Sequence, residues 1–333
     1  MTITTAFTEL VGCRVPIQLA GMGSASTPEL AAAVSNAGGL GMLAAVADDL
    51  SGDIDAVLRA APGQPVGVNF LMPFFDRALL EAVAPRVRLV EWFWSQPDPA
   101  LVSVAHDAGA LAGWQVGSVD EARAAADAGC DLIVAQGIEA GGHVRGTIGL
   151  LPLLDGVLDA VDVPVIAAGG IGTARAVAAV LAAGASAARI GTRFVATVES
   201  GAHPSYQQAL VVAEAADTVV TETYSVWWSD PGDRAHRVLR SAVSAAEALD
   251  GEFVGDVSGA GEPFRIPRFA VRPPDRATRG HIEAMALYAG QSVGAVTTIL
   301  PAAEVVGELA GGAEQVLNTM SKAIRPNPAA QAS

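Results

Sequence analysis

The residue in this sequence best suited to proton transfer is His143. It ends the run Gln136-Gly-Ile-Glu-Ala-Gly-Gly-His143, which directly follows an apolar stretch. The pair Gly141-Gly142 lets the backbone approach a flat ligand, and an imidazole that titrates near neutral pH can take a proton from a substrate carbon or return it. A single histidine is more often structural, but its place beside two glycines after a predicted strand favours a catalytic acid–base role.

Two further glycine turns are suited to hold a phosphate group. Gly169-Gly170 and Gly191-Thr192 each lead from an apolar strand into a predicted helix. Exposed backbone N–H groups and the positive potential of a helix N-terminus together attract a phosphate dianion. The alternative is that these glycines serve only tight turns. Because two successive turns carry the pattern, we expect a ligand with a phosphate group here.

Neutral amide side chains end three of the predicted strands. They are Asn69, Gln115 and Gln136, and Gly21-Met22 follows the first strand. The ring of a flavin presents N1, O2, N3 and O4 along one edge, and neutral amides can hydrogen-bond to that edge without fixing its charge. Each amide could instead satisfy the backbone of its own loop. Together with the phosphate turns, they favour a flavin that carries a phosphate.

The sequence has no pattern typical of a metal site or of a serine hydrolase. The other histidines have no partner at metal-ligand spacing, and no GxSxG motif is present. The histidines concerned are His106, His203, His236 and His281. We therefore expect no metal.

The two cysteines, Cys13 and Cys130, lack a CxxC spacing and are expected to be buried free thiols.

The candidate residues lie at the ends of regularly alternating strands and helices. Apolar runs predict strands at 16–20, 39–44, 66–71, 87–93, 110–116, 131–136, 164–168 and 187–190. Helices are predicted at 28–36, 53–60, 77–83, 100–108, 119–128, 150–161, 174–183 and 205–215. Eight such units predict an α/β fold, the closed (β/α)8 or TIM barrel, whose strand ends carry the site. The alternative is an open doubly wound sheet, but the first turn, Gly21-Met-Gly-Ser, lacks the glycine spacing that such a sheet needs.

The alternation stops after residue 215. We expect residues 1–215 to form the barrel with the flavin site. Residues 216–290, with Trp227-Trp228 and a predicted helix at 235–249 that includes His236, are expected to form a smaller C-terminal cap over the barrel mouth. Helical patterning over 282–323 predicts that residues 291–325 pack back on the barrel as helices, and residues 326–333 are expected to be a flexible tail.

Composition limits the partners and the compartment. Of the 333 residues, 51% are hydrophobic, and the formal net charge is −15. An acidic chain repels nucleic-acid phosphates, and polar residues, glycine or proline interrupt every apolar run before it reaches the length of a membrane span. The N-terminus lacks the basic and apolar regions of a signal peptide. We therefore expect a cytoplasmic enzyme that acts on a small-molecule substrate and has no nucleic-acid or membrane partner. The composition does not decide whether the protein forms homo-oligomers.

Several of these segments resemble the nitronate monooxygenase family. The similar segments are Gly21-Met22, 31–41, 67–70, Gln136-Gly-Ile-Glu-Ala-Gly-Gly-His143, 165–171, 191–194 and 288–294. The resemblance covers nearly the whole chain, its most specific part is the Glu-Ala-Gly-Gly-His run, and residues 224–279 match least.

The resemblance implies a non-covalently bound FMN and the oxidation of an alkyl nitronate by O2 to a carbonyl compound and nitrite. It also implies that His143 is the active-site base, which a neutral nitroalkane needs for loss of its α-proton. The expected FMN site consists of Gly21, Met22, Asn69, Gln115, Gln136, Gly141, Gly142, Gly169, Gly170, Arg189, Gly191 and Thr192. The expected substrate pocket consists of Trp94, Arg145, Tyr288 and Gln291.

Two positions depart from the family's pattern. Val144 separates His143 from Arg145, whereas many relatives have the histidine directly followed by Arg-Gly. The loop could therefore present Arg145 differently, and this arginine could either meet an anionic substrate or be solvated. Arg189 stands on the eighth predicted strand where glutamine is common.

The same barrel and Gly-Gly-His loop are also similar to two other groups of flavoenzymes. These are the FMN-dependent enoyl reductases of fatty-acid synthesis and the flavin NADH:quinone reductases. In both, a reduced nicotinamide reduces the flavin and O2 is not the intended acceptor. An FMN-dependent NAD(P)H reductase is therefore the alternative function, and a non-catalytic flavin-binding sensor is a second alternative.

Overall fold

Eight parallel strands form a barrel in the computed structural model, which describes residues 3–46, 49–230, 232, 234–257 and 264–323. The strands are β1 (Ile17–Leu19), β2 (Gly41–Ala44), β3 (Val66–Leu71), β4 (Leu89–Phe93), β5 (Leu111–Val116), β6 (Leu132–Gln136), β8 (Val165–Ala168) and β9 (Ala187–Ile190). They pair in the order β1-β9-β8-β6-β5-β4-β3-β2. A parallel bridge between Gln18 and Leu40 brings β1 beside β2 and closes the ring.

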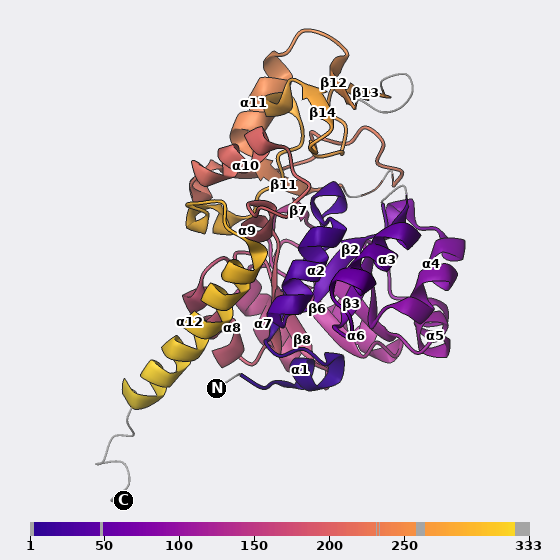
Figure 1. The fold of residues 1–333 in the computed structure, drawn as a ribbon, viewed down its shortest axis with the longest axis vertical. Helices are drawn as coiled ribbons and strands as arrows, with labels where there is room; N and C mark the ends of the chain where they lie inside the picture. The colour runs from indigo at the N-terminus through magenta and orange to yellow at the C-terminus, as the bar shows by residue number, and fades with distance from the viewer. Residues whose placement is uncertain (1–2, 47–48, 231, 233, 258–263, 324–333) are drawn as a thin grey trace, which may run out of the picture.

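Helix α1 precedes the first strand, the other helices follow strands, and together they surround the barrel (Figure 1). They are α1 (Ala6–Val11), α2 (Pro28–Ala37), α3 (Leu50–Ala60), α4 (Arg77–Val83), α5 (Pro99–Asp107), α6 (Val119–Asp127), α7 (Leu150–Leu158), α8 (Ala174–Ala182) and α9 (Thr192–Val195). The side chains of Thr27, Ser118 and Thr173 accept backbone N–H bonds at the starts of α2, α6 and α8. These bonds satisfy donors that a helix start leaves free, which explains why the helices begin there.

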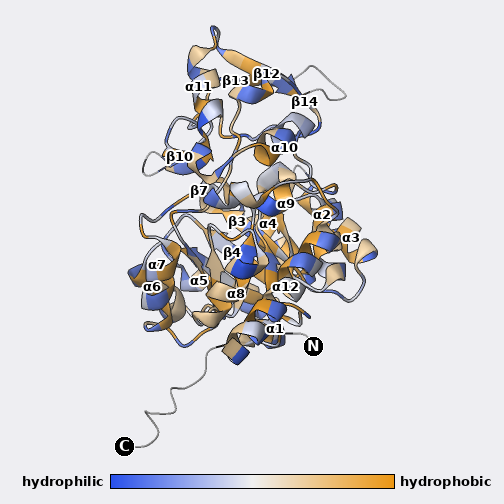
Figure 2. Cartoon of the chain, turned by 90° about the vertical axis from the view of Figure 1, so that its left-hand side faces the viewer, coloured by the Kyte–Doolittle hydropathy of each residue, from blue (hydrophilic) through white to orange (hydrophobic). Residues whose placement is uncertain are grey.

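The apolar core lies between the barrel strands and the helices. Every residue of β1, β2, β4, β6, β8 and β9 is buried, as expected for a parallel sheet that is covered on both faces. Figure 2 shows both polar and apolar residues along the helices that surround the barrel. The long helix α12 (Ala302–Ala323) packs against α2 and α8, and the Glu199 carboxylate accepts a hydrogen bond from Ala302 N–H at its start (2.9 Å).

The predicted TIM barrel is confirmed. Strands β3 and β9 and helix α4 have the predicted bounds, and most other elements differ by one or two residues at an end. Helix α3 begins at Leu50 rather than at residue 53, because the Asp49 side chain caps it by accepting from Gly52 N–H. Helix α7 ends at Leu158 rather than at 161, and α10 (Pro204–Val211) ends before the predicted residue 215.

A smaller region stands over one end of the barrel (Figure 1). It contains two three-stranded antiparallel sheets, β10-β11-β7 and β13-β12-β14, together with helices α10 and α11. Their bounds are β7 (Gly142–His143), β10 (Thr218–Thr221), β11 (His236–Leu239), α11 (Arg240–Ala248), β12 (Phe253–Val257), β13 (Phe264–Pro267) and β14 (Thr278–Gly280). Strand β7 belongs to a barrel loop, so the first of these sheets joins the barrel to the cap.

The prediction of one helix over 235–249 is wrong in its first part. His236–Leu239 form strand β11, and helix α11 begins only at Arg240. Strand β11 pairs with β10 on one side and with β7 on the other. These pairings satisfy its backbone groups in the interior, and this tertiary context outweighs the local helical pattern.

Two further parts of the chain after residue 215 differ from expectation. The region 282–323 is not one helical run, because short 3-10 turns at Ile282–Ala284 and Gln291–Ala295 precede α12. After α11, where the sequence pattern predicts no regular element, the chain contributes strands β12, β13 and β14. The predicted tail, 326–333, lies outside the described residues.

Both cysteines are free thiols. Cys130 is buried and Cys13 half-buried, and burial raises the pKa of each thiol to about 12. The thiols are therefore protonated and unreactive at neutral pH. Among the helices of the described ranges, none has the length and apolar character that a membrane crossing requires.

Candidate active site

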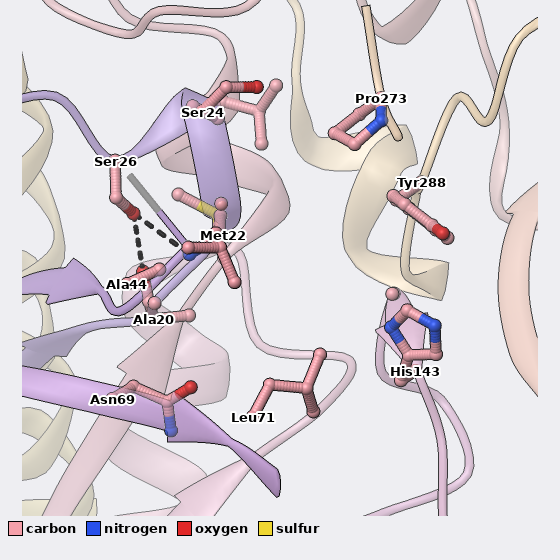
Figure 3. A pocket seen from close by; sticks show the side chains of 18 of the residues that line it. Ala20, Met22, Ser24, Ser26, Ala44, Asn69, Leu71, His143, Pro273 and Tyr288 are labelled. Carbon is pink, nitrogen blue, oxygen red and sulfur yellow. Dashed lines mark hydrogen bonds between the residues drawn. The ribbon is translucent and has the colours of Figure 1, made fainter. Parts of the chain in front are cut away.

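A cavity of about 750 Å³ opens at the carboxyl ends of the barrel strands. We call the lining residues on the barrel strand ends and their glycine turns the floor, and those around His143, Tyr288 and 271–273 the roof. Figure 3 shows Asn69 and Leu71 on the one side and His143 and Tyr288 on the other. A cavity at this end of the barrel is where TIM-barrel enzymes bind their ligands.

A charged network of four residues crosses the barrel interior and reaches the floor. Glu91 of β4 is fully buried and forms an ion pair with Arg189 of β9, a strand that does not neighbour β4. The Glu91 carboxylate also accepts hydrogen bonds from Asn69 Nδ2 (2.8 Å) and Gln18 Nε2 (3.0 Å). A buried charge persists only when it is paired and hydrogen-bonded. The four residues therefore form one unit, and two of them, Asn69 and Arg189, line the cavity.

The other two predicted amides use their polar groups differently. Gln115 lines the cavity, and its side chain makes no hydrogen bond to another described residue. It is thus available to a ligand. Gln136 also lines the cavity, but its Nε2 donates to His143 O (2.9 Å) and its Oε1 accepts from Arg145 N–H (3.4 Å). Gln136 therefore fixes the shape of the turn that carries His143.

The two glycine turns lie side by side because they follow neighbouring strands. Gly169 and Gly170 follow β8 with φ of 106° and 69°, a region that glycine adopts readily and other residues rarely do. Gly191 and Thr192 follow β9, and all four residues line the cavity. The N–H groups of Gly169, Gly170 and Thr192 make no hydrogen bond within the described part of the chain. This arrangement is suited to bind an anionic group.

The turn after β1 packs closely on the floor. Met22 N–H donates to Ser26 Oγ (2.9 Å), and Ser26 Oγ donates to Ala20 O (3.2 Å), which fixes the turn (Figure 3). A Cβ on Gly21 would lie 2.8 Å from Asn69 Cβ, so this close approach requires glycine. Both Gly21 and Met22 line the cavity.

His143 lies on β7, in register with His236 of β11. Its ring stacks on Trp228, with centroids 4.1 Å apart and an interplanar angle of 13°, and the Tyr288 ring lies 5.5 Å away. The ring lines the cavity on the side opposite Asn69 (Figure 3). Its Nε2 is buried and has no hydrogen-bond partner among the described residues.

The surroundings of His143 keep its imidazole neutral. Burial, and to a smaller extent the neighbouring His236, lowers the pKa of His143 from 6.5 to about 3. His236 is neutral as well, because burial lowers its pKa. Its Nε2 accepts from Tyr224 N–H (3.2 Å), which leaves the ring proton on Nδ1, next to Arg234 O (2.8 Å). His143 is thus a neutral acceptor at pH 7 that would hold a proton only weakly.

The segment around Gly290 ties the roof to the floor. Gly290 N–H donates to Thr192 Oγ1 (2.9 Å), and a Cβ on Gly141 would lie 2.4 Å from Gly290 N. Gly141 therefore permits contact between two chain segments, in addition to lining the cavity. Gly142 lines it too and has a φ of 76°.

Of the predicted substrate residues, Tyr288 lines the cavity and Gln291 does not. The Tyr288 hydroxyl donates to Val271 O (2.7 Å), which joins two segments of the roof. Gln291 is exposed, and its N–H donates to Glu139 O (2.9 Å).

The other two predicted substrate residues lie behind the His143 turn. Trp94 is buried, with a φ of 81°, and contacts His143 and Trp228 edge-on. The Arg145 guanidinium pairs with Glu121, with Nε 2.5 Å from Oε1, and lies over the Trp94 ring. Neither residue is among those that line the cavity.

Several residues of the site were not found from the sequence. Glu91 and Gln18 are polar residues inside apolar strands, and that contrast was an available signal for a buried network. His236 and Trp228 reach His143 from the cap by long-range contacts that leave no local pattern. Within the described ranges, no group of three or more His, Cys, Asp or Glu residues could hold a metal ion.

Comparison with known proteins gives the chain a family. The sequence pattern of the nitronate monooxygenase family matches residues 4–84 and 72–312. A carboxyl-CoA dehydrogenase of Rhodococcus jostii, named (3aS,4S,5R,7aS)-5-hydroxy-7a-methyl-1-oxo-octahydro-1H-indene-4-carboxyl-CoA dehydrogenase, is 34% identical over 78% of this chain and 72% of its own length. A probable nitronate monooxygenase of Staphylococcus aureus is 31% identical over 66% of this chain and 75% of its own length.

Solved structures agree with this assignment. FabK from Thermotoga maritima superimposes with a TM-score of 0.78 at 29% identity, over 97% of this chain and all (100%) of that one. Nitroalkane oxidase from Streptomyces ansochromogenes superimposes with a TM-score of 0.72 at 32% identity, over 95% of this chain and 100% of its own. The chain therefore belongs to the nitronate monooxygenase family of flavin-dependent oxidoreductases on a TIM barrel.

Proposed function

We propose that this protein binds FMN and oxidises alkyl nitronates with O2, giving a carbonyl compound and nitrite. The observation that carries the proposal is a neutral imidazole that lies across the cavity from Asn69, in a cavity that is also lined by two glycine turns with N–H groups unpaired among the described residues. When bound, FMN would accept electrons from the substrate and pass them to O2. The remaining tasks of binding, orientation and proton transfer belong to the protein's own residues.

The residues of the floor fit FMN by their chemistry. The free N–H groups of Gly169, Gly170 and Thr192 suit its phosphate, because backbone donors are strong partners for phosphate oxygens. Gln115 offers an unpaired amide to the ring, and Arg189 offers N–H donors. The turns of Gly21-Met22 and Gly141-Gly142 would bound the same cofactor, with Asn69, Gln136 and Gly191 completing the site.

His143 is proposed as the residue that receives a proton from the substrate. Its low pKa makes it a weak base, so it would remove the α-proton of a neutral nitroalkane slowly, whereas a nitronate has already lost that proton and does not need this step. Trp228 and Tyr288 would hold the imidazole ring in place and exclude water from it. Trp94 and Arg145 would support the His143 turn from behind, and the exposed Gln291 is proposed only as a neighbour of the pocket.

A second function is favoured by the extent of the cavity. Beyond Met22 it continues to Val46 and Phe74 and to the cap residues Trp227, Phe264 and Arg272. Trp227 and Phe264 are exposed, and their rings lie 5.3 Å apart. A nitronate needs little of this space, whereas a long acyl thioester could fill it. Since a relative is named as a carboxyl-CoA dehydrogenase, the second candidate is FMN-dependent oxidoreduction of a CoA thioester, with NAD(P)H as partner.

One experiment separates the two candidates. The FMN-loaded protein is mixed anaerobically with propionate 3-nitronate, and separately with NADH or NADPH, while flavin absorbance is followed. Bleaching by the nitronate, with nitrite release and O2 uptake when air is admitted, supports the proposal. Rapid bleaching by a pyridine nucleotide, without reaction of the nitronate, overturns it. Reoxidation of that bleached sample by an enoyl-CoA would then support the second candidate.

A further inference from the structure

The ion pair between Glu91 and Arg189 crosses the interior of the barrel. Gln18 is in register with Arg189 on the neighbouring strands β1 and β9, and Asn69 is in register with Glu91 on β3 and β4. The carboxylate of Glu91 joins these two pairs through three donors. It is fully buried, so its charge depends entirely on those donors for stabilisation.

Glu91 fixes which group Asn69 turns toward the cavity. Because Asn69 Nδ2 donates to Glu91 Oε1, the amide oxygen of Asn69 is left on the cavity side. Figure 3 shows this oxygen directed toward the cavity and the nitrogen directed away from it. A ligand therefore meets a hydrogen-bond acceptor at Asn69.

Glu91 also fixes the guanidinium of Arg189. One nitrogen, Nη1, is used in the ion pair with Glu91 Oε1. The other N–H groups of Arg189 make no hydrogen bond to a described residue, and the side chain lines the cavity. Since the same carboxylate oxygen accepts from both residues, a cationic donor stands next to the Asn69 acceptor.

We propose that Glu91 is a positioning residue that directs Asn69 and Arg189 at the pyrimidine edge of bound FMN, and that its negative charge, paired with Arg189, limits how far this arginine raises the cofactor's midpoint potential. This inference rests on the proposed FMN site. That edge carries an N–H donor beside carbonyl acceptors, which matches an acceptor beside a cationic donor. Reduction adds negative charge to this part of the ring. Arg189 favours the reduced form for that reason, and the nearby negative charge of Glu91 limits the effect.

Substitutions at the two charges should move the potential in opposite directions. In Glu91→Gln, which keeps the shape and removes the charge, the preference for reduced over oxidised FMN rises about tenfold, equivalent to ~30 mV for two electrons. In Arg189→Gln the preference falls by a similar factor. The midpoint potential of the double variant should lie close to that of the unaltered protein, because both charges are gone. The potentials are measured on FMN-loaded protein by equilibration with reference dyes.

The control is Glu121→Gln, which removes the carboxylate of an Arg–Glu pair outside the cavity and should leave the potential unchanged. The inference is overturned if FMN binds but Glu91→Gln and Arg189→Gln shift the potential in the same direction, or not at all. Should Glu91→Gln fail to fold, Arg189→Gln alone must still lower the potential. Failure of the unaltered protein to bind FMN would overturn the proposed function and this inference with it.

Discussion

The floor and the roof of the cavity are built on different principles. The floor consists of the ends of neighbouring parallel strands and the turns that follow them, so its residues meet because the barrel closes. The roof depends on pairing between β7, in a barrel loop, and β11, in the cap, where His143 is in register with His236. The difference separates the tasks. The floor, built on barrel strand ends, suits cofactor binding, and burial in the roof lowers the pKa of His143.

This comparison makes the two halves separable by mutation. Changes in the floor should alter cofactor affinity or potential first. Changes in the roof should leave cofactor binding intact and alter turnover or the dependence of stability on pH.

The largest effect is expected for His143→Ala in the roof. Loss of the imidazole should lower kcat/KM for a neutral nitroalkane about 10³-fold, a typical value for a general base. The effect on the matching nitronate should be smaller, because no α-proton has to be removed. FMN affinity should stay within about threefold, since the binding groups lie in the floor. Steady-state rates on both substrate forms and an FMN titration test this.

The matched control for His143→Ala is His106→Ala, because His106 is half exposed and pairs with Asp131 outside the cavity. Equal losses on the nitroalkane and the nitronate would contradict the assigned role of His143 as a base.

In the floor, Gly169→Ala should weaken FMN binding about 100-fold, or ~2.8 kcal/mol. Residue 169 has a φ of 106°, and an added Cβ would lie 2.9 Å from Gly137 O, so the turn must move. Gly184→Ala is the control, because Gly184 has a φ of 107° but follows helix α8 away from the cavity. If both substitutions weakened FMN binding alike, the turn at Gly169 would have no special role in the site.

Stability should fall as the pH falls from 8 to 5. The unfolded imidazole of His143 binds a proton below its ordinary pKa of 6.5, whereas the folded one resists protonation until about pH 3. Between these values the unfolded state binds more protons, so the stabilisation present above pH 6.5 is progressively lost, by ~2 kcal/mol at pH 5. Urea unfolding at a series of pH values measures this. His143→Phe should flatten the dependence, and an unchanged slope in that variant would count against a neutral buried His143.

The smallest effect is expected for Arg145→Gln. Arg145 is engaged with Glu121 and lies outside the cavity lining, so KM for a nitronate should change less than about threefold. A larger rise in KM, on the order of tenfold or more, would show that this arginine turns into the pocket when substrate binds.

The sequence predicted the floor better than the roof, for physical reasons. Strand ends and their glycine turns are local features, so the sequence alone is enough to place Asn69, Gln115 and the turns at 169–170 and 191–192 at the barrel mouth. The helix expected over 235–249 conceals β11, because pairing with two distant strands outweighs local propensity. A polar residue inside an apolar strand is a local signal for a buried network, but the sequence does not show that Glu91 pairs with Arg189, since the two meet only once the barrel has closed.

The most direct test of a flavin phosphate bound on the floor is a fluorescence titration of the flavin-free protein with FMN and with riboflavin. If the turns at Gly169-Gly170 and Gly191-Thr192 hold the phosphate, FMN should bind with 1:1 stoichiometry and about 100-fold more tightly than riboflavin, a difference of ~2.8 kcal/mol. Equal affinities for the two flavins, or no saturable binding of FMN, would contradict the assignment of this cavity.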